Sequence, residues 1–433
     1  MPDRRHILRS QIKATAGVWS DIQKEQGPVD RWLANYFYRF RKQFGSRDKK
    51  FISTVIYALF RHKSLLTAWA GKFSETSAGE PIVILTAAAE NCISENDFRS
   101  EITPYCRKTP FHSGIYSMLQ AYHLPDTVRF DSPEEEMALK FSFPLWLVKR
   151  WIAAFGLQEA RRMLEASQTR PPLVVRSNPL KITREMLIER FKGAGFDISP
   201  TMRSPFGIVF RERVNVFDSD EFRNGFFEIQ DEGSQLVCVT IDPKPGEMIW
   251  DVCAGGGGKT LLMAALMQNK GRLVATDLRS WKLGELKKRA QRAGAYNIFP
   301  ADLNRMDEIN AARHGFDKIL VDAPCSGTGT LRRNPDAKWK LSDAEFELNH
   351  KDQVAILEKS LPYLRAGGKI YYATCSVDPV ENEGVIQEVL SRHPELAVER
   401  ISDRPDGHFH LLPAKDGTDG FFMAAMTQRS EKI

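Results

Sequence analysis

The sequence of 433 residues contains no apolar run of about 18 residues, the length that crosses a membrane. Its first residues, MPDRRHILRSQIKA, also lack the apolar stretch of a secretion signal. Cysteine is sparse: there are six, with no CxxC pair and no Cys/His cluster. We therefore expect a cytoplasmic protein with free thiols, no membrane segment and no bound metal. With 42% hydrophobic and 27% charged residues, the composition is typical of a globular chain.

The net charge of +6 is unevenly distributed along the chain. Residues 1–75 hold 15 Lys or Arg against 6 Asp or Glu, so the remainder is slightly acidic. Within this part, RWLANYFYRFRKQFGSRDKKF mixes aromatic and cationic residues, a pattern suited to RNA phosphates and bases. The alternative is an amphipathic helix whose aromatic residues are core and whose charges are merely solvated. The candidate phosphate-binding residues in this stretch are Arg39, Arg41 and Lys42.

Three regions follow one another along the chain. Residues 1–140 show mostly helical apolar spacing, and residues 141–230 read as a small α+β unit. From residue 231 to 433, strands alternate with helices, which predicts an α/β fold with a doubly wound, mainly parallel, Rossmann-like sheet. The last apolar stretch, GFFMAAMT, is predicted to form an edge strand.

A glycine-rich loop follows the first predicted strand of that sheet. In DVCAGGGGKT, four glycines allow a sharp turn and a close approach of a ligand to a helix N-terminus. Asp277 ends the next predicted strand, where a carboxylate can accept two ribose hydroxyls. The alternative is a tight turn without a ligand, but the pair favours a nucleoside-containing cofactor. Asp302, after the third strand, is either a contact to adenine or a helix cap.

Two cysteines follow neighbouring predicted strands, KILVDAP and KIYYAT. We expect Cys325 and Cys375 to face one crevice, because ligands bind at the carboxyl ends of parallel strands. Asp322 shares that edge, and Arg332 and Arg333 follow closely as candidates for holding RNA phosphates. Such parts suit methylation of a pyrimidine: a thiolate adds to carbon 6, carbon 5 then attacks a methyl group, and a base removes the carbon 5 proton.

The motifs DEGSQLV, DVCAGGGGKT, DAPCSGTGTLRRNPDAKW and ATCSVDPVENE together resemble the RNA cytosine-5 methyltransferases of the Fmu/Sun type. The resemblance covers roughly residues 140–433 and, less strongly, the helical N-terminal part. It implies S-adenosylmethionine as cofactor and RNA as partner. In bacteria the implied target is small-subunit ribosomal RNA, with transfer RNA as the alternative. We expect a monomer. The implied cofactor-binding residues are Cys253, Ala254, Gly255, Gly256, Gly257, Gly258, Lys259, Asp277, Asp302 and Asp322.

The same resemblance assigns catalytic roles. It implies that Cys375 is the nucleophile, that Cys325 assists release of the methylated product, and that Asp322 contacts the target cytosine. One departure concerns the cofactor loop, where the family often has Ala-Pro and this chain has Gly255 and Gly256.

Three other functions fit parts of the pattern. A DNA cytosine-5 methyltransferase would use Cys325 as nucleophile, but it leaves Cys375 and the basic N-terminal part unexplained. A nicotinamide-dependent oxidoreductase could use the glycine loop, but it does not need the two thiols. A non-catalytic RNA-binding assembly factor would not need both cysteines and Asp322 intact.

Overall fold

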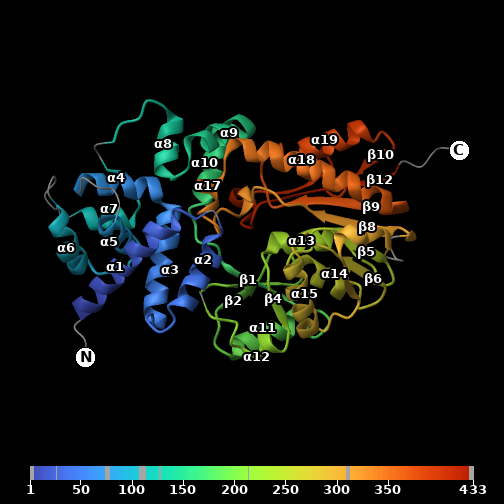
Figure 1. Cartoon of the computed structure of the whole chain (residues 1–433), viewed down its shortest axis with the longest axis horizontal. Coiled ribbons are helices and arrows are strands. Elements are labelled where there is room, and N and C mark those ends of the chain that lie inside the picture. Colours follow the sequence, from blue (N-terminus) through green and yellow to red (C-terminus); the bar gives the residue numbers. More distant parts are fainter. Residues whose placement is uncertain are drawn as a thin grey trace. The chain divides into compact units, whose positions relative to one another are not determined.

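The computed structural model describes residues 4–25, 27–73, 79–106, 114–125, 128–212, 214–308 and 313–428. The chain forms two compact units (Figure 1). One consists of Met1–Arg170 and Leu331–Leu341, and the other of Pro171–Thr330 and Ser342–Ile433.

The described part of the first unit is built from helices. Side-chain caps fix some of their starts, since Ser94 and Ser132 accept backbone N–H groups at the beginning of α6 and α8. The bounds are α1 (Arg4–Ile22), α2 (Val29–Arg39), α3 (Ser46–Arg61), α4 (Lys63–Phe73), α5 (Glu80–Ala89), α6 (Glu95–Ile102), α7 (Ile115–Gln120), α8 (Pro133–Lys140), α9 (Leu145–Phe155), α10 (Leu157–Ala166) and α17 (Ala337–Lys340). This agrees with the helical spacing of the sequence.

The core of this unit surrounds α5, whose residues 81–89 are all buried. Apolar faces of α1, α3 and α4 pack around it. A helix that is apolar on every side is stable in water only inside such a core.

The segment Leu331–Leu341 belongs to this helical unit, although it follows the Cys325 loop in sequence. Lys338 is buried, donates a 2.9 Å hydrogen bond from Nζ to the Arg61 carbonyl and lies 4.2 Å from the Phe143 ring centroid. The Trp339 indole N–H donates to the Phe60 carbonyl over 2.7 Å. Polar bonds to main-chain carbonyls therefore anchor the segment.

The second unit begins with a four-stranded antiparallel sheet in the order β2-β3-β1-β4. Phe191 of α11 packs against Phe210 and Phe227 of this sheet. The apolar stretches PPLVVRSN and GIVFRE, each typical of a strand, form β1 and β3. The bounds are β1 (Leu173–Ser177), α11 (Arg184–Gly193), β2 (Ile198–Pro200), β3 (Gly207–Phe210), α12 (Asp220–Arg223) and β4 (Phe227–Ile229).

The larger sheet has the order β10-β12-β9-β8-β5-β6-β7, with β11 paired to β12. Its strands β7, β6, β5, β8 and β9 are parallel, which confirms the predicted doubly wound α/β fold. The bounds are α13 (Glu232–Ile241), β5 (Met248–Asp251), α14 (Gly258–Leu266), β6 (Arg272–Ala275), α15 (Ser280–Ala293), β7 (Ile298–Pro300), β8 (Phe316–Asp322), α18 (Asp343–Ser360), β9 (Leu364–Thr374), α19 (Glu383–Arg392), β10 (Leu396–Glu399), β11 (Phe409–Leu411), α20 (Pro413–Asp416) and β12 (Phe421–Gln428).

Helices cover both faces of this sheet (Figure 1). On one face, α13, α14 and α15 pack over side chains such as Ile249 and Leu273. On the other, α18 and α19 pack over Trp250 and Val274. Successive strand residues point to opposite faces, so each strand contributes to both cores.

The prediction that GFFMAAMT forms an edge strand is wrong. In the structure this stretch is β12, which lies between β9 and β10. Residues 421–426 are all buried, as expected for a central strand covered on both faces. The two strands that place β12 inside the sheet, β10 and β11, are short and were not predicted.

Contacts group residues 141–170 with the helices before them. The predicted division into 1–140, 141–230 and 231–433 stays a prediction. No helix within the described residues is both long enough and apolar enough to span a membrane.

Candidate active site

The glycine loop connects the end of β5 to the start of α14. Gly255 has φ +55° and Gly257 has φ +87°, in the left-handed region that favours glycine. A Cβ on Gly257 would lie 2.1 Å from Cδ1 of Leu286. The loop therefore needs glycine at that position, and it runs directly into the N-terminus of a helix.

Asp277 lies beside this loop, as predicted. Its Oδ2 accepts a hydrogen bond from the Gly255 N–H at 2.9 Å, and its Oδ1 accepts one from the Arg279 N–H at 2.8 Å. Lys282 Nζ also lies 3.8 Å from Oδ2. A carboxylate has about four acceptor positions, so acceptor capacity remains for hydroxyl groups. Asp302 follows β7, is exposed and accepts from the Asn304 N–H at 3.0 Å. Its position after the third strand is as predicted. Its contact with Asn304 fits the alternative role of a helix cap, because Asp302 directly precedes the short helix Leu303–Glu308.

Asp251 ends β5 under the glycine loop and was not singled out by sequence reasoning. It is buried, and its Oδ2 accepts from the Thr260 hydroxyl at 2.7 Å. Burial raises its pKa to about 7. The signal for this contact was present in the sequence, because Asp251 and Thr260 begin and end the DVCAGGGGKT motif.

Lys259, the last residue of the predicted cofactor loop, is paired with Asp322. Its Nζ lies 2.7 Å from Asp322 Oδ2, and the ammonium lies 5.2 Å from the Phe421 ring centroid. Burial lowers the pKa of Lys259, but Asp322 outweighs burial and raises it, so the ammonium stays charged. The cofactor loop and the motif that carries Cys325 are thus joined by an ion pair.

The two predicted thiols meet at the edge where β8 and β9 end. Their Sγ atoms are 3.4 Å apart, and both cysteines are free and half-buried. Asp322 at the end of β8 pairs in register with Ala373 of β9, so the residues that follow emerge side by side. The expectation that both thiols face one place is met.

Hydrogen bonding with Cys375, together with burial, raises the pKa of Cys325 well above its usual range. Cys325 therefore keeps its proton near neutral pH. Either sulfur can be the donor in the contact between them.

Glycines let the Cys325 loop pass close to the Cys375 backbone. The Gly329 N–H donates to the Cys375 carbonyl at 2.9 Å, and a Cβ on Gly329 would lie 2.3 Å from the Gly420 carbonyl oxygen. Gly327 has φ +68°. Both glycines are thus required by the course of the backbone.

A buried polar network fixes the two cysteine loops to each other. Glu381, fully buried, accepts from the Ser326 N–H at 2.8 Å and from the Asn349 amide at 2.9 Å. The hydroxyls of Thr328 and Ser376 lie 3.0 Å apart. Sequence reasoning gave these residues no role, because their contacts join residues between 32 and 55 positions apart.

The predicted RNA-binding arginines that follow Cys325 lie in the helical unit. Arg332 is only 6% exposed, and its carbonyl accepts from Arg61 Nη2 at 2.8 Å. That burial does not fit the predicted role of its side chain in holding phosphates. Arg333 is half-buried, and its role stays a prediction.

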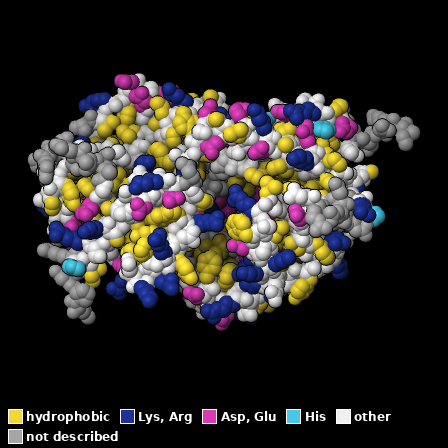
Figure 2. All heavy atoms as spheres, viewed as in Figure 1, with side chains coloured by type: hydrophobic (Ala, Val, Ile, Leu, Met, Phe, Trp, Pro, Cys, Tyr) yellow, Lys and Arg dark blue, Asp and Glu magenta, His cyan; other side chains and the backbone are white. Residues whose placement is uncertain are grey.

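The three predicted cations of the N-terminal part are exposed: Arg39, Arg41 and Lys42. The Arg41 guanidinium lies 5.1 Å from the ring centroid of Tyr38, which is 73% exposed. Lys and Arg side chains gather around the α2–α3 region (Figure 2). The aromatic side chain and the cations are therefore accessible to a polyanion.

Two family models match the chain. Residues 238–427 match the 16S rRNA methyltransferase RsmB/F model, and residues 143–217 match the ferredoxin-like domain of RsmF/B-like methyltransferases. The first match contains the glycine loop, Asp277 and both cysteines. The second contains the first three strands of the small antiparallel sheet.

Two solved structures are similar in fold. The crystal structure of PH0851 has a TM-score of 0.77 at 23% identity and covers 99% of this chain and 100% of its own. A methyltransferase homolog protein from Pyrococcus horikoshii has a TM-score of 0.61 at 29% identity and covers 69% of this chain and 100% of its own.

A relative with a described activity matches most of the chain. It is the probable ribosomal RNA small subunit methyltransferase B of Bacillus subtilis (strain 168), 32% identical over 330 residues, which are 74% of each protein. Such identity over this length, with the domain match around the paired thiols, decides the family. The chain belongs to the RsmB/F family of 16S ribosomal RNA methyltransferases.

Proposed function

We propose that this chain methylates carbon 5 of a cytosine in small-subunit ribosomal RNA through a covalent adduct with Cys375. The observation that carries the proposal is the 3.4 Å approach of two thiols beside the Lys259–Asp322 ion pair. The methyl donor is S-adenosylmethionine, the cofactor of this family of methyltransferases.

The glycine loop suits this cofactor. Gly255 and Gly257 have left-handed backbone and no side chains, so a ligand can approach the loop closely. The N-terminus of α14 supplies N–H groups. Asp277, held by the Gly255 N–H, retains acceptor positions for two ribose hydroxyls. When bound, the cofactor supplies an electrophilic methyl group on a sulfonium. We assign its binding to residues 253–259 and Asp277.

The two thiols divide the covalent work. The Cys375 thiolate adds to carbon 6 of the cytosine, which makes carbon 5 nucleophilic toward the methyl group. After transfer, the carbon 5 proton leaves to a base, and the carbon 6–sulfur bond breaks with its electrons returning to Cys375. Cys325 assists this release: its thiol proton passes to the departing Cys375 sulfur, and the resulting Cys325 thiolate, a strong base because of its raised pKa, accepts the carbon 5 proton.

Asp322 recognises the target base. Lys259 binds one carboxylate oxygen of Asp322. This bond restricts rotation of the Asp322 side chain and so fixes the direction of its other oxygen. That second oxygen, at the end of β8, is the one available to ring nitrogen 3 of the cytosine. Because nitrogen 3 is an acceptor, this oxygen carries the proton that the ring nitrogen takes up as Cys375 adds to carbon 6. The resemblance of the Pro-Cys motif to its family supports this assignment.

RNA is held by exposed cationic side chains of the helical unit. Exposed Arg39, Arg41 and Lys42 are the candidates in the helical unit. Ribosomal RNA as substrate is supported by the activity ascribed to the Bacillus subtilis relative. We further propose that residues 1–140 and 141–230 act as RNA-binding regions and that the protein works as a monomer.

Bisulfite sequencing of RNA from a strain deleted for this gene tests the proposal. One cytosine of small-subunit ribosomal RNA is expected to lose protection in the deletion strain. Complementation with the intact gene should restore it, and complementation with a Cys375→Ala gene should not. Unchanged protection of every ribosomal cytosine would contradict the proposed substrate.

A further inference from the structure

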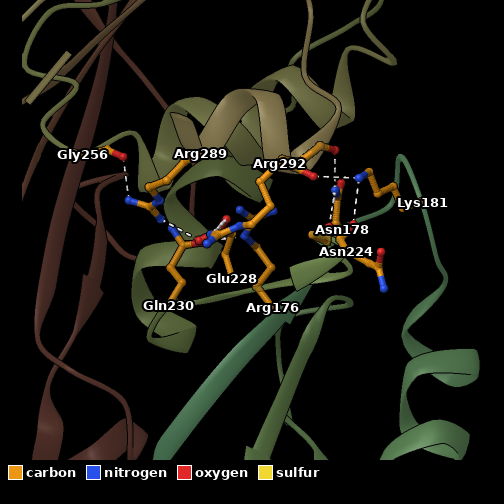
Figure 3. Close-up of polar contacts among 11 residues, drawn as sticks. Arg176, Asn178, Lys181, Asn224, Glu228, Gln230, Gly256, Arg289 and Arg292 are labelled. Atoms are coloured by element: carbon orange, nitrogen blue, oxygen red, sulfur yellow. Dashed lines mark hydrogen bonds and ion pairs between the residues drawn. The ribbon is translucent and has the colours of Figure 1, made fainter. Parts of the chain in front are cut away.

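A buried carboxylate of the small sheet is connected to the cofactor loop through one arginine. Glu228 of β4 is 4% exposed and accepts a 2.9 Å hydrogen bond from Nη2 of Arg289, which projects from α15. The other end of the same guanidinium donates from Nη1 to the Gly256 carbonyl at 2.6 Å. Figure 3 shows Arg289 between these two groups.

The position of the bond within the loop is specific. Gly256 lies between Gly255 and Gly257. The Gly255 N–H binds Asp277, and a Cβ added at Gly257 would collide with Leu286. A Cβ on Gly256 itself would lie 3.1 Å from Arg289 Nη1, a tight contact. The glycine therefore leaves the space that the guanidinium uses.

Arg292 offers a comparison within the same helix. It also contacts Glu228, through the other carboxylate oxygen, and its guanidinium lies 4.0 Å from the Phe222 ring centroid. Both of these partners belong to the region of the small sheet, whereas Arg289 reaches the glycine loop as well (Figure 3). The two arginines thus share a partner but differ in what else they bind.

We propose that Arg289 is a positioning residue for the cofactor loop and that Glu228 holds it there. Through this pair, the small antiparallel sheet sets the affinity of the protein for S-adenosylmethionine. A charge-assisted bond to the Gly256 carbonyl restrains a loop that has two successive glycines where the family often has Ala-Pro. The inference rests on the proposed binding of the cofactor to residues 253–259.

The test compares full-length Arg289→Ala, Arg289→Lys and Arg292→Ala proteins. Calorimetry measures the Kd for S-adenosylmethionine, and thermal unfolding without cofactor measures Tm. Arg289→Ala is expected to raise Kd about ten-fold, the effect of losing one charge-assisted bond. Arg289→Lys should recover part of the affinity, since an ammonium can still donate to the carbonyl. Arg292→Ala should lower Tm as much as Arg289→Ala but raise Kd less than about two-fold.

A second comparison isolates the contact. Gly256→Ala should weaken cofactor binding in the wild-type background and weaken it less in the Arg289→Ala background, because the tight contact is then absent. Equal increases of Kd in the Arg289→Ala and Arg292→Ala proteins would overturn the inference. So would an unchanged Kd in Arg289→Ala when Asp277→Ala binds weakly. If the Kd for S-adenosylmethionine is unchanged in both Arg289→Ala and Asp277→Ala, the proposed cofactor site is overturned instead.

Discussion

The Sγ atoms of Cys325 and Cys375 lie 3.4 Å apart, although the two residues are 50 positions apart in the sequence. Parallel pairing of β8 and β9 produces this approach, and the Glu381 network maintains it. Because both sulfurs lie at one place, their roles can be separated by removing each cysteine in turn.

The first prediction concerns these thiols. Cys375→Ala should abolish both methyl transfer and any covalent complex with RNA, because no sulfur remains to attack carbon 6. Cys325→Ala should permit attack and transfer but stall release, so a covalent protein–RNA complex should accumulate. A denaturing gel with labelled RNA and cofactor measures this complex.

Cys92→Ala is the matched control, since that thiol belongs to the helical unit and both site thiols belong to the other. It should behave like the wild type. A slow-migrating band with Cys375→Ala instead of Cys325→Ala would make Cys325 the nucleophile, as in the DNA-type arrangement.

The second prediction concerns Asp277. Asp277→Ala should raise the Kd for S-adenosylmethionine at least about ten-fold, because it removes both the hydroxyl acceptor and the partner of the Gly255 N–H. Asp277→Asn keeps one acceptor oxygen and should lose less affinity. Calorimetry measures both, with circular dichroism as a check of the fold. Wild-type affinity in Asp277→Ala would exclude the assignment.

The third prediction concerns salt. Replacing Arg39, Arg41 and Lys42 together by Gln should reduce the slope of log Kd for RNA against log salt by about 2, if each contacts one phosphate of single-stranded RNA. The control replaces exposed Lys270, Lys287 and Lys288 in the other unit, with the same change in net charge. Equal slopes for the two triple variants would show that the N-terminal cations are solvated and do not bind RNA phosphates.

The fourth prediction concerns pH. Burial lowers the pKa of His350, but hydrogen bonds to Glu388 at 2.6 Å and to the Val380 carbonyl at 2.7 Å outweigh burial, so the pKa lies above its ordinary value. Folding therefore favours the protonated ring. The stabilisation is fully present below the unfolded pKa of about 6.5 and is lost as pH rises through the folded pKa.

The Tm difference between wild type and His350→Gln measures this effect. It should be roughly 2 °C at acidic pH and should shrink at alkaline pH. His314→Gln, at an exposed position, should change Tm little at any pH. A Tm difference that grows with pH would contradict the direction of the His350 pKa shift.

Much of the fold could be predicted because local signals agreed with it. Alternating strands and helices predicted the parallel sheet, and strand ends correctly located Asp277, Cys325 and Cys375. The strands β10 and β11 are too short to show a clear alternation of apolar and polar residues, so the sequence does not reveal them. Without them, β12 is predicted at the edge of the sheet. Arg289 and Glu228 carry no local signal, because 61 positions separate them and only the packing of α15 on the small sheet brings them together.

The membership of Leu331–Leu341 in the helical unit has a consequence for biosynthesis. A nascent chain leaves the ribosome N-terminus first, so residues 4–170 are made long before this segment exists. Until then the Phe60 and Arg61 carbonyls lack the Trp339 and Lys338 donors that later bind them. The helical unit therefore reaches its final form only after the Cys325 loop has been synthesised. A fragment ending at Arg170 therefore lacks part of the helical unit, although it is long enough for a domain.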